Sequence, residues 1–302
     1  MLGRRQIREK VVENLYAYQQ NPIAYDVLER NMFSEIEKIY HLYVYQLNFF
    51  VALKDLALNQ IEIGKQKFIK SEQDLNPNEK FVNNRILSLI ELNSERINFT
   101  AKHKELEWDL HDELLVKTFQ RIKGGKRYVD YMASEEDSFE NDQKFIGKLF
   151  LRYIAENEDF HDRLEEKEMS WADDLHISNS MIQKTIGFFK ESEPSTTLIK
   201  MLKDDEDKSF ASKLLWESIK NWDAAEEKIK SRLENWDLER ISLMDKIILV
   251  CGITELDFFK TIASRIIINE YVEIAKVYGS SKSNLFINGI LDKYAKDTNR
   301  IN

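Results

Sequence analysis

The sequence predicts an all-α protein, and three observations carry this prediction. The chain of 302 residues contains only nine Gly and three Pro, roughly a third of the combined share that these residues take in average proteins. β-Sandwiches, β-barrels and doubly wound α/β folds need more of these turn-forming residues. Apolar residues recur at intervals of three and four along most of the chain, as one face of a helix requires. With 43% hydrophobic residues, the chain can also bury a sizeable core.

The first helix is expected at residues 4–20. Its apolar side chains, from Ile7 to Tyr18, are spaced by three or four, and the following Asn21-Pro22 is a stop signal. The next stretch, 33–70, is rich in aromatic residues and contains no Pro. It predicts one very long helix or two abutting helices whose aromatic side chains lie in the core.

The middle of the chain predicts further helices separated by short connections. They are expected from just after Asn78 to beyond Ile97, at 106–122, at 142–154 and at 171–189, the last one followed by a turn-rich run at 192–197. The pair Gly124-Gly125 is interpreted as a turn. No strand pattern precedes it and no Gly-Lys-Ser element follows it, so it lacks the context of a phosphate-binding loop.

The last hundred residues predict a compact helical bundle. Their helices are expected to begin near Asp205, to continue through Trp222 to Trp236 and Leu238 to Phe258, and to end with Ile266 to Tyr278 and a helix around Phe286 to Tyr294. The short connections between these segments favour a bundle. We therefore expect a first helix at 1–20, a helical insertion at 21–204 and a bundle at 205–302.

Charge is distributed unevenly along the chain. The net charge is −9, but residues 135–168 contain 12 acids and five bases, so this segment alone carries −7. Residues 1–10 carry +3. Because partners respond to local patches rather than to the total, the sequence predicts a basic amino-terminal end and a separate acidic belt.

Catalytic, metal-binding and cofactor chemistry is not indicated. The single Cys251 lies in an apolar run, and none of the five His forms a ligand pair of zinc-site spacing. The chain shows no nucleotide loop, nucleophile elbow or kinase motif set. No signal peptide or membrane span is recognisable, and one Cys suits a reducing compartment. We expect a cytoplasmic protein without catalytic residues, metal or cofactor.

The basic turn of the first helix suggests a binding role. At 100° per residue, Arg4 and Arg8 share a face with Ile7, Val11 and Leu15, so the stripe changes from cationic to apolar along the helix. Guanidinium groups suit phosphate oxygens and base stacking. The alternative is a solvated basic helix start, although bases at that position oppose the helix dipole.

The first helix and the last hundred residues resemble a known family. The string GRRQIREKVVENLYAYQ is similar to the opening helix of the NusB transcription antitermination family, with its Arg-rich turn and Leu-Tyr pair. Three later strings match the family's motifs in order and spacing: NWDLERISLMDKIILVCGITEL, IIINEYVEIAKVYGSS and NLFINGILDKYAK. The resemblance covers 3–20 and 205–298.

The resemblance implies an all-α RNA-binding protein. Such a protein binds the boxA element of nascent ribosomal RNA together with the ribosomal protein NusE, as part of the transcription elongation complex. The implied RNA-binding residues are Arg4, Arg5, Arg8, Lys282 and Phe286. The implied protein-partner residues are Tyr16 and Asp245. We expect the cationic helix tip to lie beside the loop before Phe286, so that both grip one unpaired strand.

Several motif residues also have structural interpretations. Asn269 and Glu270 are expected to cap amides near a helix start. Gly289 within a helix costs about 1 kcal/mol relative to Ala, so close packing is its expected reason. The chain departs from the family where Leu285 replaces a Lys and where 261–263 lacks a Pro.

Two other functional classes are alternatives to RNA binding. One is a helical protein-interaction scaffold that has lost RNA binding, which the net charge and Leu285 favour. The other is an RNA methyltransferase, which needs a following α/β domain with a nucleophilic Cys, and we expect no such domain here. Because an acidic surface repels RNA, we expect residues 135–168 to lie away from Arg4 and Arg8, where they brace the bundle or dock a basic protein.

Overall fold

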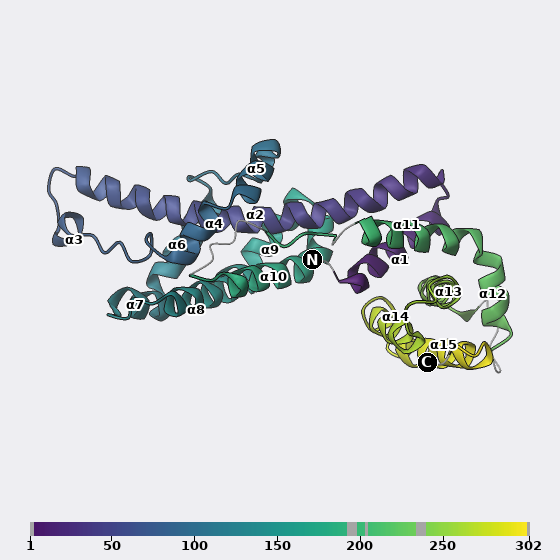
Figure 1. Ribbon diagram of the computed structural model, residues 1–302. Coiled ribbons are helices and arrows are strands. Elements are labelled where there is room, and N and C mark those ends of the chain that lie inside the picture. The colour runs from purple at the N-terminus through teal and green to yellow at the C-terminus, as the bar shows by residue number, and fades with distance from the viewer. Residues whose placement is uncertain (1–2, 192–197, 203–204, 234–239, 301–302) are drawn as a thin grey trace. The chain divides into compact units, whose positions relative to one another are not determined.

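A computed structural model describes residues 3–191, 198–202, 205–233 and 240–300, and Figure 1 shows its ribbon. The described residues form helices and contain no β-strand, which confirms the all-α prediction. Contacts divide the chain into two compact units. Unit 1 comprises Met1–Ile36 and Met201–Asn302, and unit 2 comprises Glu37–Lys200.

Unit 1 is a helical bundle built around one nearly fully buried helix. Its helices are α1 (Arg4–Gln20), α11 (Asp205–Lys220), α12 (Trp222–Lys230), α13 (Leu243–Phe258), α14 (Ser264–Tyr278) and α15 (Ser283–Asp297), together with the start of α2 (Tyr25–Gln66). Helix α13 contacts α1, α11, α12, α14 and α15. The predicted first helix has the bounds of α1.

Close packing around α13 depends on a glycine. A Cβ atom added at Gly252 would clash with Leu291 of α15 and crowd Tyr271 of α14. Both neighbouring helices therefore approach α13 closely at this level. Gly279 forms the C-cap of α14, where the sequence predicted that this helix would stop.

Unit 2 packs shorter helices against the long helix α2. These are α3 (Glu72–Leu75), α4 (Arg85–Glu91), α5 (Ser94–Lys102), the 3₁₀ turn η1 (Lys104–Leu106), α6 (Glu113–Gly124), α7 (Lys126–Ala133), α8 (Phe139–Phe150), the π turn η2 (Leu151–Ala155), α9 (Glu158–Lys167) and α10 (Ser170–Phe188). Tyr43, Phe49 and Phe50 of α2 are fully buried, as predicted for aromatic core residues.

Helix boundaries in unit 2 differ from the prediction where polar side chains cap the backbone. The helix expected from just after Asn78 to beyond Ile97 is two helices, because the Asn84 side chain caps α4 and the Asn93 side chain caps α5. Asp112 likewise starts α6 later than expected. The turn predicted at Gly124-Gly125 is confirmed, since Gly125 separates α6 from α7.

Some predictions fall on residues that the structure does not describe. The turn-rich run 192–197 and residues Trp236 and Leu238 lie outside the described ranges. The sequence-based division at residues 20 and 204 stays a prediction, and so does the position of residues 135–168 relative to Arg4 and Arg8. None of the helices in the described ranges is both long enough and apolar enough to cross a membrane.

Candidate nucleic-acid interface

Arg8 lies in the core of unit 1. Its side chain is 2% exposed, its Nε donates to Glu255 Oε2 at 2.8 Å, and its Nη2 donates to the other carboxylate oxygen. Tyr271 also donates to Glu255 Oε2, at 2.8 Å. Burial opposes the charge of Arg8, but the bonds and attraction from Glu255 prevail and raise its pKa. Arg8 thus anchors α1 to α13, and the expected RNA contact by this residue is corrected to a structural role.

Arg4 and Arg5 remain partly exposed but are paired with acids. Arg5 donates from Nε and Nη2 to the two carboxylate oxygens of Glu270 at 3.1 and 3.0 Å, which raises the pKa of Arg5. Arg4 donates to Glu206 at 2.6 Å and lies 3.6 Å from Asp207. The Arg4 and Arg5 side chains keep 36% and 39% of their exposure. A phosphate can reach either guanidinium only by sharing it with a carboxylate.

An aromatic ring packs against the same turn from α11. The Cζ atoms of Arg4 and Arg8 lie 5.1 and 5.2 Å from the centroid of the Phe210 ring, within the range of cation–π attraction. Phe210 in turn packs edge-on against Phe259. The basic turn is therefore fixed in place by α11, α13 and α14 rather than projecting freely.

The direction of α14 separates the remaining predicted residues from the basic turn. Arg5 pairs with Glu270, and eight residues later Glu13 accepts a bond from Tyr278, so α1 and α14 run in the same direction. Eight residues span about 12 Å of helix. Lys282 follows the far end of α14. The sequence predicted that Lys282 and the basic turn would lie side by side. In the structure they lie at different levels of unit 1.

Phe286 and its neighbours lie at the beginning of α15. Phe286 is partly buried and Lys282 is exposed. Leu285, which replaces the family's Lys, is 72% exposed, so a cation at this position would have stood in solvent. The RNA role of Lys282 and Phe286 stays a proposal.

The two predicted protein-partner residues lie on different helices of unit 1. Asp245 lies in the first turn of α13, ten residues before the Glu255 that pairs with Arg8. Tyr16 lies on α1, eight residues after Arg8. Tyr16 is 39% exposed, whereas Asp245 is 8% exposed, and no donor among the described residues reaches Asp245 Oδ1.

The structure corrects two interpretations of the motif residues. Glu270 lies in the middle of α14 and pairs with Arg5, so it caps no helix start. Gly289 is exposed, and a Cβ atom added there would meet nothing within 4 Å, so close packing within this chain does not explain it. The acids opposite the basic turn were missed because pairs such as Arg5 and Glu270 are far apart in sequence.

One cluster in unit 2 has the composition of a metal site. Ligand atoms of Glu37, His41 and His103 lie within 4.8 Å of one another, and His41 Nε2 is buried without a hydrogen-bond partner among the described residues. Tetrahedral zinc, with bonds of about 2.0–2.1 Å, places its ligand atoms about 3.3 Å apart. The side chains would therefore have to close around an ion, and the expectation of no metal stays a prediction.

Comparison with known proteins supports the resemblance seen in the motifs. A sequence model of the NusB family matches residues 174–296. The chain is 44% identical over 97 residues to the transcription antitermination protein NusB of Methylacidiphilum infernorum, covering 32% of this chain and 68% of that protein. It is 37% identical over 109 residues to NusB of Bacillus cereus, covering 36% and 83%.

Proposed function

Because the chain belongs to the NusB family, we propose that it is a non-enzymatic RNA-binding factor of transcription antitermination. In this proposal it binds boxA-like single-stranded RNA in nascent ribosomal RNA together with NusE. The observation that carries the proposal is the similarity to proteins named for antitermination over 68% and 83% of their length.

The geometry of unit 1 suggests how RNA would lie. Arg4 and Arg5 offer partly exposed guanidiniums at one level of α1, and Lys282 and Phe286 lie beyond the far end of α14. A strand that used all four would run along the bundle rather than be gripped at one point. Arg8 would hold α1 in register without touching RNA. NusE would dock on unit 1 through Tyr16 and Asp245.

The alternative is a protein-interaction scaffold without RNA binding. The pairing of Arg4 with Glu206 and of Arg5 with Glu270 favours it, because both guanidiniums already have carboxylate partners. A phosphate must then compete with those carboxylates.

Salt titration separates these two functions. We would measure the affinity for boxA RNA with and without NusE by fluorescence anisotropy at several salt concentrations. RNA binding predicts that log K falls linearly with log salt, and that replacing both Arg4 and Arg5 by Ala lowers the slope by about 1.4, or about 0.7 for each lost contact to a single strand.

A matched control removes the same charge elsewhere in unit 1. Lys220→Ala with Lys230→Ala removes two exposed cations from α11 and α12 and should leave the slope nearly unchanged. An affinity for boxA RNA that ignores salt, or an equal loss of slope in both double variants, would leave only the scaffold.

A further inference from the structure

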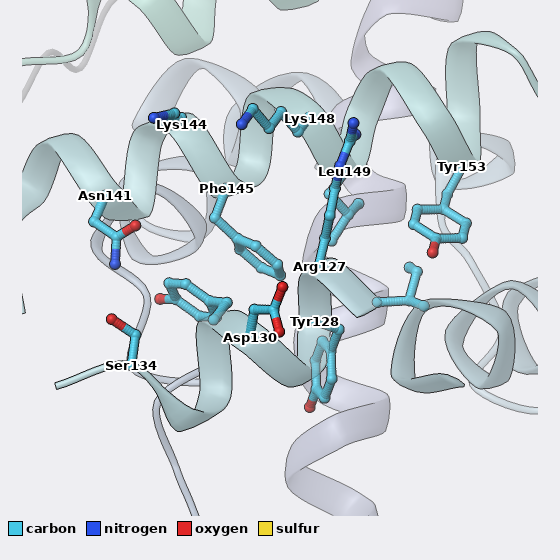
Figure 2. A pocket seen from close by; sticks show the side chains of 12 residues that line it. Arg127, Tyr128, Asp130, Ser134, Asn141, Lys144, Phe145, Lys148, Leu149 and Tyr153 are labelled. Atoms are coloured by element: carbon cyan, nitrogen blue, oxygen red, sulfur yellow. The ribbon is translucent and has the colours of Figure 1, made fainter. Parts of the chain in front are cut away.

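Unit 2 contains a pocket between α7 and α8 (Figure 2). Its volume is about 270 Å³. Phe145 and Leu149 of α8 are buried in its floor, and the Phe145 ring stacks on Tyr131 of α7 at 3.9 Å. Figure 2 shows Phe145 pointing from α8 toward α7. The pocket therefore has a fixed, apolar, aromatic base.

Two further tyrosines form its walls. Tyr128 and Tyr153 both line the pocket and are partly buried. Tyr153 lies on the π turn that ends α8, and its hydroxyl occupies the space that a Cβ atom at Gly125 would need. Burial raises the pKa of Tyr128 to about 12, so its hydroxyl stays a hydrogen-bond donor at neutral pH.

Three cations surround this aromatic base without being neutralised. Arg127, Lys144 and Lys148 line the pocket and are exposed, and none of them forms an ion pair or hydrogen bond with another side chain in the described ranges. Figure 2 shows Arg127 reaching from α7 toward α8, with Lys144 and Lys148 along α8. Asp130 is the one carboxylate in the lining, so the pocket carries a net charge of +2.

Cations recur every four residues along α8 and the π turn that follows it. Lys144 and Lys148 are four residues apart, so both project on one side of α8. Arg152 of η2 follows after another four residues and pairs with Glu156. They belong to the segment 135–168, whose summed charge is −7. The acidic total therefore hides a local cationic stripe.

We propose that this pocket is a second RNA contact, which holds one nucleotide of a single strand. Arg127, Lys144 and Lys148 bind its flanking phosphates, and the base lies on the aromatic floor and walls. Cations beside aromatic rings are the usual combination for single strands. The volume lies just below the roughly 300–1,000 Å³ of drug-sized ligand sites, which suits one nucleotide. An acidic peptide would use the cations but not the aromatic base. The choice of RNA as the ligand rests on the proposed function, whereas the choice of the contacting residues rests on the pocket itself.

The test uses the full chain and a labelled oligouridylate of 12 nucleotides. To isolate the pocket, it is done both in the natural sequence and in the Arg4→Ala, Arg5→Ala background. Replacing Arg127, Lys144 and Lys148 by Ala is expected to weaken binding and to lower the salt slope by about 2, or about 0.7 for each phosphate contact. These side chains are exposed, so the variant should keep its unfolding temperature.

The matched control removes three other exposed lysines of unit 2. Lys70→Ala, Lys102→Ala and Lys184→Ala cause the same change in net charge and should leave the slope close to its original value. Equal losses in the two triple variants would reduce the effect to general electrostatics and overturn the proposal. A pocket variant that binds as the natural chain does would overturn it as well.

A competition experiment distinguishes RNA from a free nucleotide. Uridine monophosphate should displace the oligomer only at concentrations far above the oligomer's Kd, because it carries one phosphate. If the monophosphate binds as tightly as the oligomer, the pocket is a nucleotide site and the RNA assignment is wrong. If Arg4 and Arg5 prove irrelevant to boxA binding while the pocket variant still loses the oligomer, the proposed function of unit 1 fails and the pocket stands.

Discussion

The basic turn of unit 1 and the pocket of unit 2 differ in how their cations are paired. In unit 1, Arg4 and Arg5 are each paired with a carboxylate, at 2.6 and 3.0 Å. In unit 2, the cations around the pocket, such as Lys144, are unpaired in the described structure. The sequence pattern indicated the reverse, a basic end at 1–10 and an acidic belt at 135–168. Charge summed along a segment therefore says little about which surface can receive an anion, because folding brings partners from distant segments.

A buried arginine in each unit also differs in its hydrogen-bond acceptors. Arg8 of unit 1 faces the carboxylate of Glu255. Arg96 of unit 2 is 8% exposed and donates to neutral acceptors, the carbonyls of Ile90 and Glu91 and the Asn48 side chain, at 2.7–2.8 Å. Burial lowers the pKa of Arg96, whereas the bonds to Glu255 outweigh burial and raise that of Arg8. The buried Arg8 of unit 1 thus depends on a compensating carboxylate, and the buried Arg96 of unit 2 does not.

The largest expected effect comes from removing one member of that pair. Arg8→Met should destabilise unit 1 by about 3–5 kcal/mol, because Glu255 is then left as a buried charge without its partner. The measurement is urea unfolding followed by circular dichroism, with the two units fitted as separate transitions.

Two further variants control this result. Arg96→Met should cost unit 2 less, about 1–3 kcal/mol, since it leaves only neutral acceptors unsatisfied. Arg8→Met combined with Glu255→Gln should recover much of the loss in unit 1, because Gln can still accept from Tyr271. A single Arg8→Met variant as stable as the natural chain would refute the anchoring role of Arg8.

A second variant tests whether the carboxylates of unit 1 restrain RNA binding. Glu270→Gln keeps a hydrogen-bond acceptor for Arg5 but removes the competing charge. If Arg5 contacts phosphate, boxA affinity should rise about fivefold near 0.1 M salt and the salt slope should steepen by about 0.7. The same substitution in the Arg5→Ala background is the control and should have no such effect. An unchanged affinity in the natural background would remove Arg5 from the interface.

Some of these features could be predicted from the sequence and others could not. The apolar spacing of α1 predicted its bounds at 4–20, and the low number of Gly and Pro residues predicted the all-α class, because both depend on local rules. The partners of Arg5 and Arg8 could not be predicted, since Glu270 and Glu255 approach them only through the packing of α13 and α14. The same holds for the pocket, where Arg127 and Lys144 come from different helices.

A variant at Gly289 tests whether this residue serves packing within unit 1 or the binding of a partner. Because Gly289 is exposed on α15 with open space around it, Gly289→Ala should stabilise unit 1 by about 0.5–1 kcal/mol through the lower entropy of the unfolded chain. Thermal unfolding measures this directly. NusE and boxA binding should be measured on the same variant. A stabilised variant with intact binding shows that nothing docks on Gly289, whereas a destabilised one contradicts the open environment.

The smallest expected effect is a pH dependence confined to unit 2. All five His lie between residues 41 and 176, hence in unit 2. Burial, and then the neighbouring His103, lower the pKa of His41, against the opposing pull of Glu37, Glu105 and Glu168. Between about pH 7.5 and the lowered pKa of His41, the unfolded chain therefore binds more protons than the folded one, because the ordinary pKa of His is about 6.5.

Unit 2 should accordingly lose stability as the pH falls from about 7.5 through the unfolded pKa of His, near 6.5, and toward the lowered pKa of His41. His41→Leu should flatten this dependence, and His111→Gln, which alters an exposed His, should not. A chelator is added so that no metal ion holds Glu37, His41 and His103 together. Unit 1 has no His and serves as the internal reference, so a matching loss in its transition would assign the effect to carboxylates rather than to the imidazole of His41.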